Sequence, residues 1–422
     1  MVKSVIVQLI TLIVVGGAAN YGLTTLGPLQ ETIRLALGLT DTQMSLLQGP
    51  ALYLPPILLG VPVGLLIDRL PRARLLVVFT ALEVGGGLLL AGAPGFAVLV
   101  LARALSGAAT TAIAMNASAL VAEITRPEQR GRTLMLLGML QIACMSLAFA
   151  LGGDFVALYG VQPNGWRWAA LWLTVPQGLV FLLSFWIREP AHAQVGALHK
   201  TTIREACIAL WRYRAMLLTL SFGLVIAAMG YMAALAWSAP MLTRSFHLQP
   251  DRTGAVMSSV LLISGVLGGS LGGMLVDLCQ RTGGPRRIIS LMAGIALLQI
   301  PAAAYGLATK LWVFVVLLTL LCTTAYMKGI ITSAATTIVI PEQLMGLSFG
   351  VMNVLSSILA SVAPVATSVL AERVGGPMAL GQAMAAVCAT TSLAALATFA
   401  YGRRYFPGLE RIATRIEPVP EG

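Results

Sequence analysis

The chain has 422 residues, of which 58% are apolar and only 10% are charged, and its formal net charge is +11. This composition excludes an ordinary water-soluble domain and predicts a polytopic helical membrane protein. The five cysteines show neither the spacing of a disulfide framework nor that of a metal site, so we expect no metal and no cofactor.

Twelve apolar runs are long enough to cross a bilayer as helices. The first run is too long for the apolar core of a cleaved signal sequence and lacks a clear small-residue cleavage site. We therefore expect it to stay as the first transmembrane helix. In chain order the runs cover residues 5–26, 44–67, 75–93, 96–122, 134–157, 168–187, 216–238, 253–276, 288–307, 312–340, 347–371 and 378–401.

Positive charges are distributed unevenly between the two sides of these predicted helices. With the N-terminus in the cytoplasm, most Lys and Arg residues fall in cytoplasmic segments. The opposite side holds only Arg34, Arg167, Arg244, Arg252, Lys310 and Arg373. This positive-inside bias predicts a protein of the cell inner membrane with both termini in the cytoplasm. The basic excess orients the chain and contacts anionic lipids, and it does not indicate a nucleic-acid partner.

The first and third runs carry polar side chains at membrane depth. Asn20 and Tyr21 lie in the outer third of the first run, where they either face a cavity or pair with a neighbouring helix. Glu83 lies on the third run, nine residues after Arg74. At 1.5 Å per residue this places it roughly 13 Å deep in the membrane. A carboxyl at that depth is unfavourable unless it is paired or protonated, so Glu83 is a candidate either for proton coupling or for a structural pair.

The fourth run contains an arginine, Arg103, which opens the sequence Arg103-Ala-Leu-Ser-Gly107. Because a guanidinium keeps its charge, Arg103 must find a carboxylate, backbone carbonyls or an anionic ligand, or else extend to the outer membrane surface. Asn116 follows deeper on the same run, and Gln141 lies on the fifth run. We treat Arg103, Asn116 and Gln141, with Asn20 and Tyr21, as candidate substrate-binding residues.

The second half adds one deep charge. Lys328 lies well inside the tenth run, where it either titrates, holds an anion as a point charge or extends toward the cytoplasm. Tyr231 on the seventh run, Tyr326 on the tenth and Asn353 on the eleventh are further candidates for substrate binding. Core packing is the alternative role for Tyr231.

Two sequence patterns occur once in each half. In the first, a glycine lies four residues before an aspartate that ends an apolar run, and a basic loop follows: Gly64 and Asp68 in one half, Gly273 and Asp277 in the other. The second pattern is Pro-Glu-Gln at 127–129 and again at 341–343. The charged residues at these cytoplasmic ends are candidates for gating: Asp68, Arg69, Arg72, Arg74, Glu123, Arg130, Arg132, Asp277, Arg281, Arg286, Arg287 and Glu342.

The first pattern and its repeat resemble the signature between helices 2 and 3 of the major facilitator superfamily and its counterpart between helices 8 and 9. One departure is Pro71, where that family usually has Gly. The sequence from Arg103 to Gly107 resembles the R-x-x-x-G motif of the same family. The Asn20-Tyr21 pair and the loop at 127–132 also resemble the organic-anion and spinster-like branches, without choosing between them. The resemblance implies an all-α membrane protein with twelve transmembrane helices in two pseudo-symmetric six-helix bundles.

On this resemblance we expect an N-terminal bundle at 1–187, a cytoplasmic linker at 188–215, a C-terminal bundle at 216–402 and a cytoplasmic tail at 403–422. The linker is expected to contain an interfacial helix over 201–213. The resemblance implies a secondary active transporter that works by alternating access, and we expect it to be a monomer. The sequence contains no nucleotide-binding motif and no nucleophile with a base, so neither an ATP-driven pump nor an enzyme is expected.

The deep charges predict the kind of substrate. Arg103 and Lys328 are cations in opposite halves, and together they predict a small organic anion of the carboxylate type. Its transport would be coupled to protons, with Glu83 as the proton-coupling residue, or to exchange for another anion. The alternative is proton-coupled efflux of amphipathic drugs or lipids through an apolar, Met-rich cavity.

Overall fold

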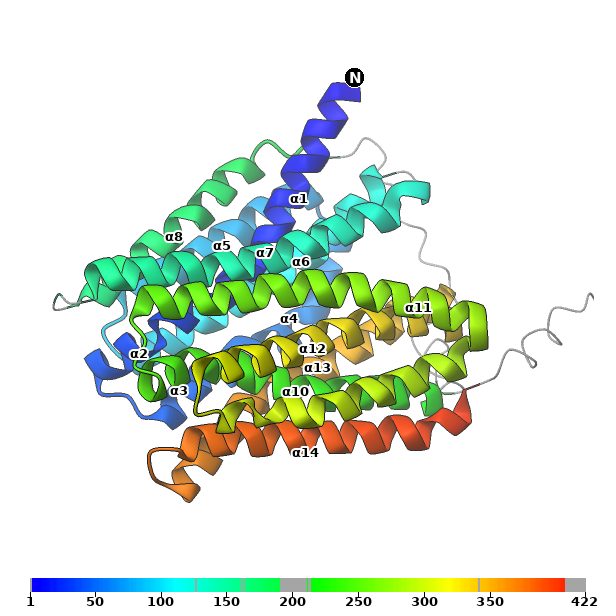
Figure 1. Cartoon of the computed structure of the whole chain (residues 1–422). Coiled ribbons are helices and arrows are strands. Elements are labelled where there is room, and N and C mark those ends of the chain that lie inside the picture. The colour runs from blue at the N-terminus through cyan, green and yellow to red at the C-terminus, as the bar shows by residue number, and fades with distance from the viewer. Residues whose placement is uncertain are drawn as a thin grey trace, which may run out of the picture. The chain divides into compact units, whose positions relative to one another are not determined.

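The computed structural model describes residues 2–125, 127–160, 162, 164–189, 211, 214–340 and 342–406. These residues form helices and short connections, and none of them lies in a β-strand (Figure 1). The predicted interfacial helix over 201–213, apart from Trp211, and the predicted tail from 407 onward lie outside the described residues. The all-helical architecture predicted from the sequence is confirmed.

In the first half of the chain, the described residues form six long helices and two short ones. The long helices are α1 (Val2–Thr24), α4 (Pro50–Arg69), α5 (Arg72–Gly92), α6 (Phe96–Ile124), α7 (Pro127–Tyr159) and α8 (Gly165–Ser184). The short helices α2 (Leu26–Leu37) and α3 (Asp41–Gln48) lie between α1 and α4. A capping box starts α3, because the Thr40 hydroxyl accepts from the Gln43 amide N–H at 3.1 Å and the Gln43 side chain accepts from the Thr40 N–H at 2.9 Å.

The second half contains α10 (Arg214–Ser245), α11 (Pro250–Ala302), α12 (Leu311–Val339), α13 (Glu342–Val374) and α14 (Ala379–Gly402), with 3-10 segments η1 (Ala303–Leu307) and η2 (Arg403–Tyr405). Helix α11 is two helices joined at Gly284, which has φ 65° and ψ −160°. A positive φ favours glycine, and the following Pro285 disfavours helical geometry at the residue before it. The break falls in the basic segment that the sequence predicts as a loop.

Ten stretches of the described residues are long and apolar enough to cross a membrane. Two of them, Pro250–Thr282 and Gly284–Leu307, are the two parts of α11. Helices α4 and α8 are long helices outside this set of ten. With them, the described part of the chain holds twelve long helices, which is the number predicted.

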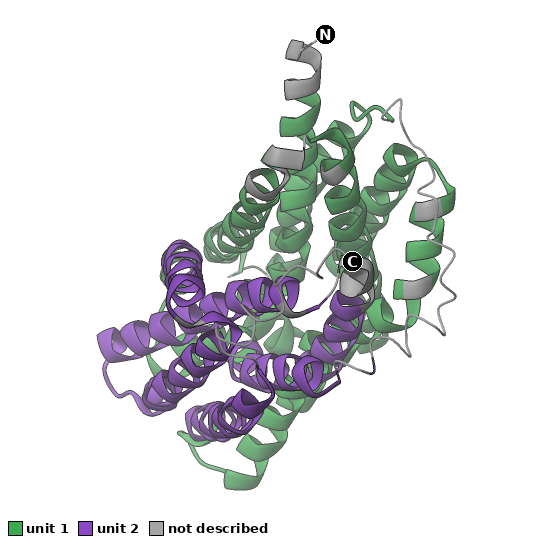
Figure 2. Ribbon diagram, turned by 90° about the vertical axis from the view of Figure 1, so that its right-hand side faces the viewer, with its two compact units in different colours: residues 1–197, 234–262, 361–380 green, residues 198–233, 263–360, 381–422 purple. Residues whose placement is uncertain are grey.

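The chain divides into two compact units (Figure 2). Unit 1 comprises residues 1–197, 234–262 and 361–380, and unit 2 comprises residues 198–233, 263–360 and 381–422. Each unit has its own apolar core, formed in unit 1 mainly by α1, α5 and α6, and in unit 2 mainly by α11 and α12, with α10 and α14. Unit 1 also contains the ends of α10, α11 and α13. The units follow contacts and not sequence repeats, so the predicted repeat boundaries at 187 and 216 stay predictions.

Candidate functional site

Glu83 lies on α5 and is only 4% exposed, inside unit 1. Its carboxylate accepts a hydrogen bond from the Thr110 hydroxyl at 3.0 Å and a longer one from the Gln177 side-chain amide at 3.4 Å. Gly22 of α1 lies against the same carboxyl, because a Cβ built at Gly22 would fall 1.6 Å from Glu83 Oε1. The absence of a side chain at Gly22 therefore allows the acid to approach the backbone of α1.

Arg103 lies on α6 and is 1% exposed. Its guanidinium donates to three backbone carbonyls: Nε to Leu47 at 3.4 Å, Nη1 to Gly22 at 3.3 Å and Nη2 to Leu23 at 3.0 Å. These carbonyls lie in the last turns of α3 and α1, where helix C-termini carry partial negative charge and carbonyls without helical partners. The sequence left a carboxylate, backbone carbonyls, an anionic ligand or the outer membrane surface as possible surroundings of Arg103. The structure shows backbone carbonyls.

Gly107, four residues after Arg103, has a packing role. A Cβ at this position would fall 1.9 Å from the carbonyl oxygen of Leu52. Helices α6 and α4 therefore touch through their backbones at this point, as small residues permit within a membrane. The R-x-x-x-G sequence thus combines a charge that binds helix ends with a glycine that lets a neighbouring helix approach.

A cavity of about 220 Å³ lies beside Glu83 within unit 1. Its wall is mainly apolar and is formed by residues of α1, α5, α6, α7 and α8. The polar groups that line it are Tyr21, Thr80, Glu83, Cys144 and Gln177. The Tyr21 hydroxyl and the Gln177 side-chain oxygen are buried and have no hydrogen-bond partner among the described residues. Of the described residues that form the wall, Glu83 is the one with a charged side chain.

Lys328 lies on α12 in unit 2 and is 1% exposed. Its ammonium donates a hydrogen bond to the side-chain oxygen of Gln299 on α11. The predicted residues Tyr231 and Tyr326 also meet in unit 2, with their hydroxyls 3.0 Å apart and their rings in an edge-to-face arrangement. Unit 2 therefore contains a buried cation and a tyrosine pair on α10 and α12.

The remaining predicted binding residues lie in different surroundings. The Asn20 amide contacts the sulfur of Met145 at 3.9 Å, and the Gln141 amide donates to the Gly16 carbonyl at 3.5 Å. Asn116 donates to the backbone carbonyl of Arg72, the first residue of α5, at 2.8 Å. Asn353 on α13 is exposed. Asn20 and Gln141 thus belong to the contact between α1 and α7, whereas Asn116 supports the start of α5.

The predicted gating residues Arg72 and Glu123 form an ion pair between α5 and α6. Arg72 also donates through Nε to the Ile67 carbonyl at 3.3 Å. The Glu189 carboxylate accepts the backbone N–H groups of Arg72 and Ala73 at 2.9 and 2.8 Å. A carboxylate at a helix N-terminus is stabilised by the free N–H groups and by the helix dipole. Glu189 is a contributor to this site that the sequence reasoning did not single out.

Other predicted gating residues contribute less to the described contacts. Arg69, Arg74, Asp277, Arg281, Arg286 and Arg287 are exposed. Arg287 donates to the Thr282 carbonyl at 3.2 Å, across the break in α11. The side chains of Asp68, Arg130, Arg132 and Glu342 lie outside the described residues. The gating roles of these residues stay predictions.

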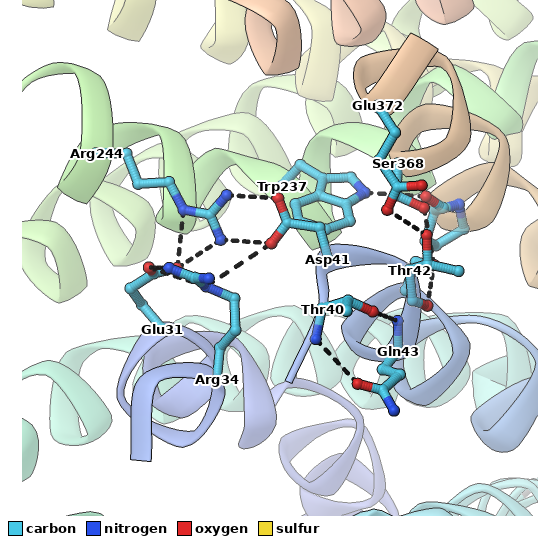
Figure 3. A network of polar contacts seen from close by, with 12 residues as sticks. Glu31, Arg34, Thr40, Asp41, Thr42, Gln43, Trp237, Arg244, Ser368 and Glu372 are labelled. Atoms are coloured by element: carbon cyan, nitrogen blue, oxygen red, sulfur yellow. Dashed lines mark hydrogen bonds and ion pairs between the residues drawn. The ribbon is translucent and has the colours of Figure 1, made fainter. Parts of the chain in front are cut away.

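A charged cluster that the sequence reasoning missed joins α2, α3 and α10 within unit 1 (Figure 3). Arg244 of α10 donates to Glu31 of α2 at 2.7 and 2.9 Å and to both oxygens of Asp41 of α3 at 2.7 and 2.8 Å. Arg34 also binds Glu31, at 2.6 and 3.1 Å, and lies 3.7 Å from Asp41. Two arginines and two carboxylates thus form a network without net charge, which we call the rim cluster.

Further contacts within unit 1 accompany the rim cluster. The Thr42 hydroxyl binds Glu372 of α13 at 2.5 Å, and the Ser45 and Ser368 hydroxyls are 2.9 Å apart. Gly153 of α7 and Gly254 of α11 touch, because a Cβ on either would fall 2.8 Å from the Cα of the other. The ends of α10, α11 and α13 are therefore joined to helices of the first sequence half.

These features define a class of protein. The described residues form twelve long helices, ten of them long and apolar enough to cross a membrane, and these helices bury an acid, an arginine and a lysine. Such an arrangement is typical of a polytopic membrane transporter. The model of the Major Facilitator Superfamily matches residues 12–364. The chain belongs to this family of transporters and not to a family of enzymes, as its repeated motifs predicted, and it is a multi-pass membrane protein.

Curated relatives match limited parts of the chain. An organic cation transporter-like protein of Drosophila melanogaster is 28% identical over 138 residues, 32% of this chain and 23% of the relative. Human solute carrier family 2, facilitated glucose transporter member 10 is 30% identical over 184 residues, 44% of this chain and 33% of the relative. The inner membrane transport protein YajR of Escherichia coli is 27% identical over 152 residues, 36% of this chain and 30% of the relative. The aligned part is thus a third or less of each relative's length.

Solved structures match the whole fold. One is a bacterial homologue of the human lysosomal transporter Spinster in an inward-facing and unoccupied conformation. Its TM-score is 0.76 at 17% identity, and the match covers 95% of this chain and 96% of the homologue's chain. A mutant form of the nucleoside transporter NupG gives a TM-score of 0.71 at 10% identity and covers 94% of this chain and 99% of its own. At these identities the likeness concerns the fold, and the predicted fold class is confirmed.

Proposed function

We propose that the protein is a secondary active transporter that carries a small organic anion, of the carboxylate type, together with protons. One observation supports this proposal above the others. Each compact unit buries a titratable side chain of opposite sign, Glu83 in unit 1 and Lys328 in unit 2. Neither has an ion-pair partner among the described residues. Charged groups buried in this way within membrane helices mark proton and substrate sites.

The surroundings of Glu83 suit a group that gains and loses a proton. When Glu83 is ionised, its oxygens accept from Thr110 and from the Gln177 amide. When it is protonated, its hydroxyl needs an acceptor, which a turn of the Gln177 amide group supplies, since the Gln177 side-chain oxygen has no partner in the described structure. Because the neutral partners Thr110 and Gln177 serve both protonation states, Glu83 can titrate without breaking an ion pair.

Lys328 is the stronger candidate for binding the anion. An ammonium has three donors, and Lys328 has one described hydrogen bond, to Gln299. A carboxylate would use the remaining donors and compensate the buried charge. Arg103 directs its three kinds of nitrogen to backbone carbonyls, so it would contribute positive potential more than direct contacts. A monovalent anion that enters with one proton on Glu83 adds no net charge.

The proposal extends to topology and assembly. The distribution of Lys and Arg favours an inner-membrane protein with both termini in the cytoplasm. In this orientation the ion pair of Arg72 with Glu123 lies on the cytoplasmic side and the rim cluster lies on the opposite side. We propose a monomer in which these two charged sites close the pathway alternately, since the two ends of an alternating-access transporter are not open together.

Proton flux in proteoliposomes tests the proposal. Purified protein is reconstituted with a trapped pH-sensitive dye, and a monocarboxylate, a dicarboxylate and an amphipathic tertiary amine are added in turn. We expect at least one carboxylate to drive proton movement, and Glu83→Gln and Lys328→Gln each to abolish it. Arg252→Gln, which removes an exposed arginine, serves as the matched control. Proton movement driven by the amine and by neither carboxylate would refute the anion proposal.

A second candidate is proton-coupled efflux of amphipathic molecules. The observation that favours it is the mainly apolar wall of the cavity beside Glu83. Thermal stabilisation separates the two candidates, because a ligand that binds the folded state raises its stability by RT ln(1 + [L]/Kd). Stabilisation by carboxylates that is lost in Lys328→Gln supports the first candidate. Stabilisation by amphipathic amines alone supports the second.

A further inference from the structure

We propose that the cavity beside Glu83 is a lateral binding site for an alkylamine, which would enter from the lipid between α7 and α8 and place its primary ammonium on the Glu83 carboxylate. This inference shares Glu83 with the proposed function, but it does not depend on which solute is transported. It rests on three properties of the cavity: where it opens, how it is lined, and which polar atoms in it lack partners.

The position of the cavity gives access from the lipid side. Its wall includes Leu147 on α7, which is 45% exposed, and the partly exposed Cys144 on α7 and Val180 on α8. Glu83 and Tyr21, at 4% and 3% exposure, lie at the buried side of the same cavity. A ligand therefore passes from an exposed apolar flank to a buried carboxyl without leaving unit 1.

The size of the cavity favours a headgroup with part of a chain. A volume of about 220 Å³ is below the roughly 300–1,000 Å³ of pockets that enclose drug-sized ligands. The remainder of an alkyl chain would stay in the lipid, where burial contributes about 0.8 kcal/mol for each CH₂. Partitioning into the bilayer thus supplies the ligand, and the polar groups of the cavity select its head.

The polar groups select a cation with several N–H donors. Because Glu83 is the one charged residue among those described in the wall, an anionic head would be repelled and a cationic head attracted. Arg103 binds the Gly22 carbonyl and is not among the residues that line the cavity. The Tyr21 hydroxyl and the Gln177 side-chain oxygen are acceptors without a partner in the described structure, and both residues are more than nine-tenths buried. With a Glu83 oxygen they make three acceptors on residues of this wall, the same number as the donors of a primary ammonium.

Photolabelling in lipid nanodiscs tests the site. The probe is a dodecylamine that carries a diazirine on its chain, and its controls are the alcohol and the trimethylammonium compound with the same chain. We expect the amine to label peptides around Cys144 and Val180, at least about tenfold more efficiently than either control, because neither control offers both the charge and the N–H donors. Equal labelling by the trimethylammonium compound would overturn the proposed match of donors.

Two variants and one matched control locate the labelling. Glu83→Gln removes the charge, and Leu147→Trp fills the entrance from the lipid side without touching Glu83. Leu136→Trp is the control, because Leu136 lies on the same helix, is 47% exposed and does not line the cavity. We expect labelling to fall by about tenfold or more in the first two variants and to persist in the third. Undiminished labelling in Leu147→Trp overturns the inference, even if Glu83→Gln abolishes transport.

The same variants separate this inference from the proposed function. If Leu147→Trp and Glu83→Gln lose the label while Glu83→Gln still couples solute to protons, the lateral site stands and the proton role of Glu83 fails. If Glu83→Gln stops proton-coupled transport but keeps the label, the lateral site fails and the proposed function stands.

Discussion

Replacing Arg244 by Gln should loosen the end of unit 1 that carries the rim cluster. The arginine makes four hydrogen bonds of 2.7–2.9 Å to Glu31 and Asp41. Without it, Arg34 faces two carboxylates, and the cluster changes from neutral to a net charge of −1. The segment formed by α2 and α3 would then lose its charged link to α10.

The size of the effect follows from burial. Exposed ion pairs contribute about 0.2–1 kcal/mol each, whereas hydrogen bonds to charged groups contribute about 1.5–3 kcal/mol when buried. Arg244 is 27% exposed, and its carboxylate partners are 16% and 26% exposed, so the pairs lie between these limits. Two ion pairs, one of them bidentate, therefore give about 1–3 kcal/mol, which corresponds to a roughly 5–150-fold change in the opening equilibrium.

Cysteine labelling measures this opening. Ser368 is fully buried on α13 and its hydroxyl contacts that of Ser45, so Ser368→Cys in a background without other cysteines reports whether the rim is open. We expect a membrane-impermeant maleimide to react at least about fivefold faster when Arg244→Gln is added, and less so at high salt, which weakens the partly exposed pairs in the parent. The control is Arg252→Gln, which removes an exposed arginine at the start of α11. Equal labelling rates in the two variants would show that the rim cluster does not hold this end closed.

Three further changes test other parts of unit 1. Arg103→Gln should lower the free energy of unfolding by roughly 2–4 kcal/mol, because it leaves carbonyls of α1 and α3 without donors, and thermal unfolding against Arg252→Gln should show this. Glu189→Gln should change stability by no more than about 1 kcal/mol but should speed hydrogen exchange at the first amides of α5, which an unchanged rate would contradict. Gly254→Ala should open the rim as Arg244→Gln does, since its Cβ would fall 2.4 Å from the carbonyl oxygen of Phe149, and unaltered maleimide labelling would count against this contact.

The helices were predictable because each depends on a continuous stretch of sequence. Apolar runs gave the number of long helices, and the Gly-Pro pair at 284–285 lies in the basic segment predicted between two of them. The repeated motifs gave the family, and the family gave the fold. Arg72 and Glu123 could be placed in one charged group because both were expected at cytoplasmic ends of adjacent helices.

The partners of buried and distant charges were not predictable in the same way. Arg103 had several allowed partners, and only the fold brings the last turns of α1 and α3 to it. Arg244 lies some 200 residues from Glu31 and Asp41. The sequence analysis placed Arg244 on one side of the membrane and did not predict its partners. Helical periodicity defines which face a residue occupies, but it does not say which helix lies opposite that face.

The chain between Gly22 and Leu47 connects the buried charges to the rim. Arg103 binds carbonyls at both ends of this stretch, and Gly22 also lies against the Glu83 carboxyl. Arg244 binds the same stretch through Glu31 and Asp41. In the proposed function, a proton that binds Glu83 removes a negative charge beside Gly22, whose carbonyl Arg103 binds, and so changes the electrostatic balance at this contact. The ion pairs of the rim cluster are partly exposed, so each contributes little to stability. A change of a few kcal/mol in the contacts around Gly22 is therefore large enough to shift the equilibrium between a closed and an open rim cluster. The segment from Gly22 to Leu47 thus contacts Glu83 of α5 at one end and carries two carboxylates of the rim cluster further along. If Glu83 is the proton site, as proposed, this segment links proton binding to the contacts of the rim cluster.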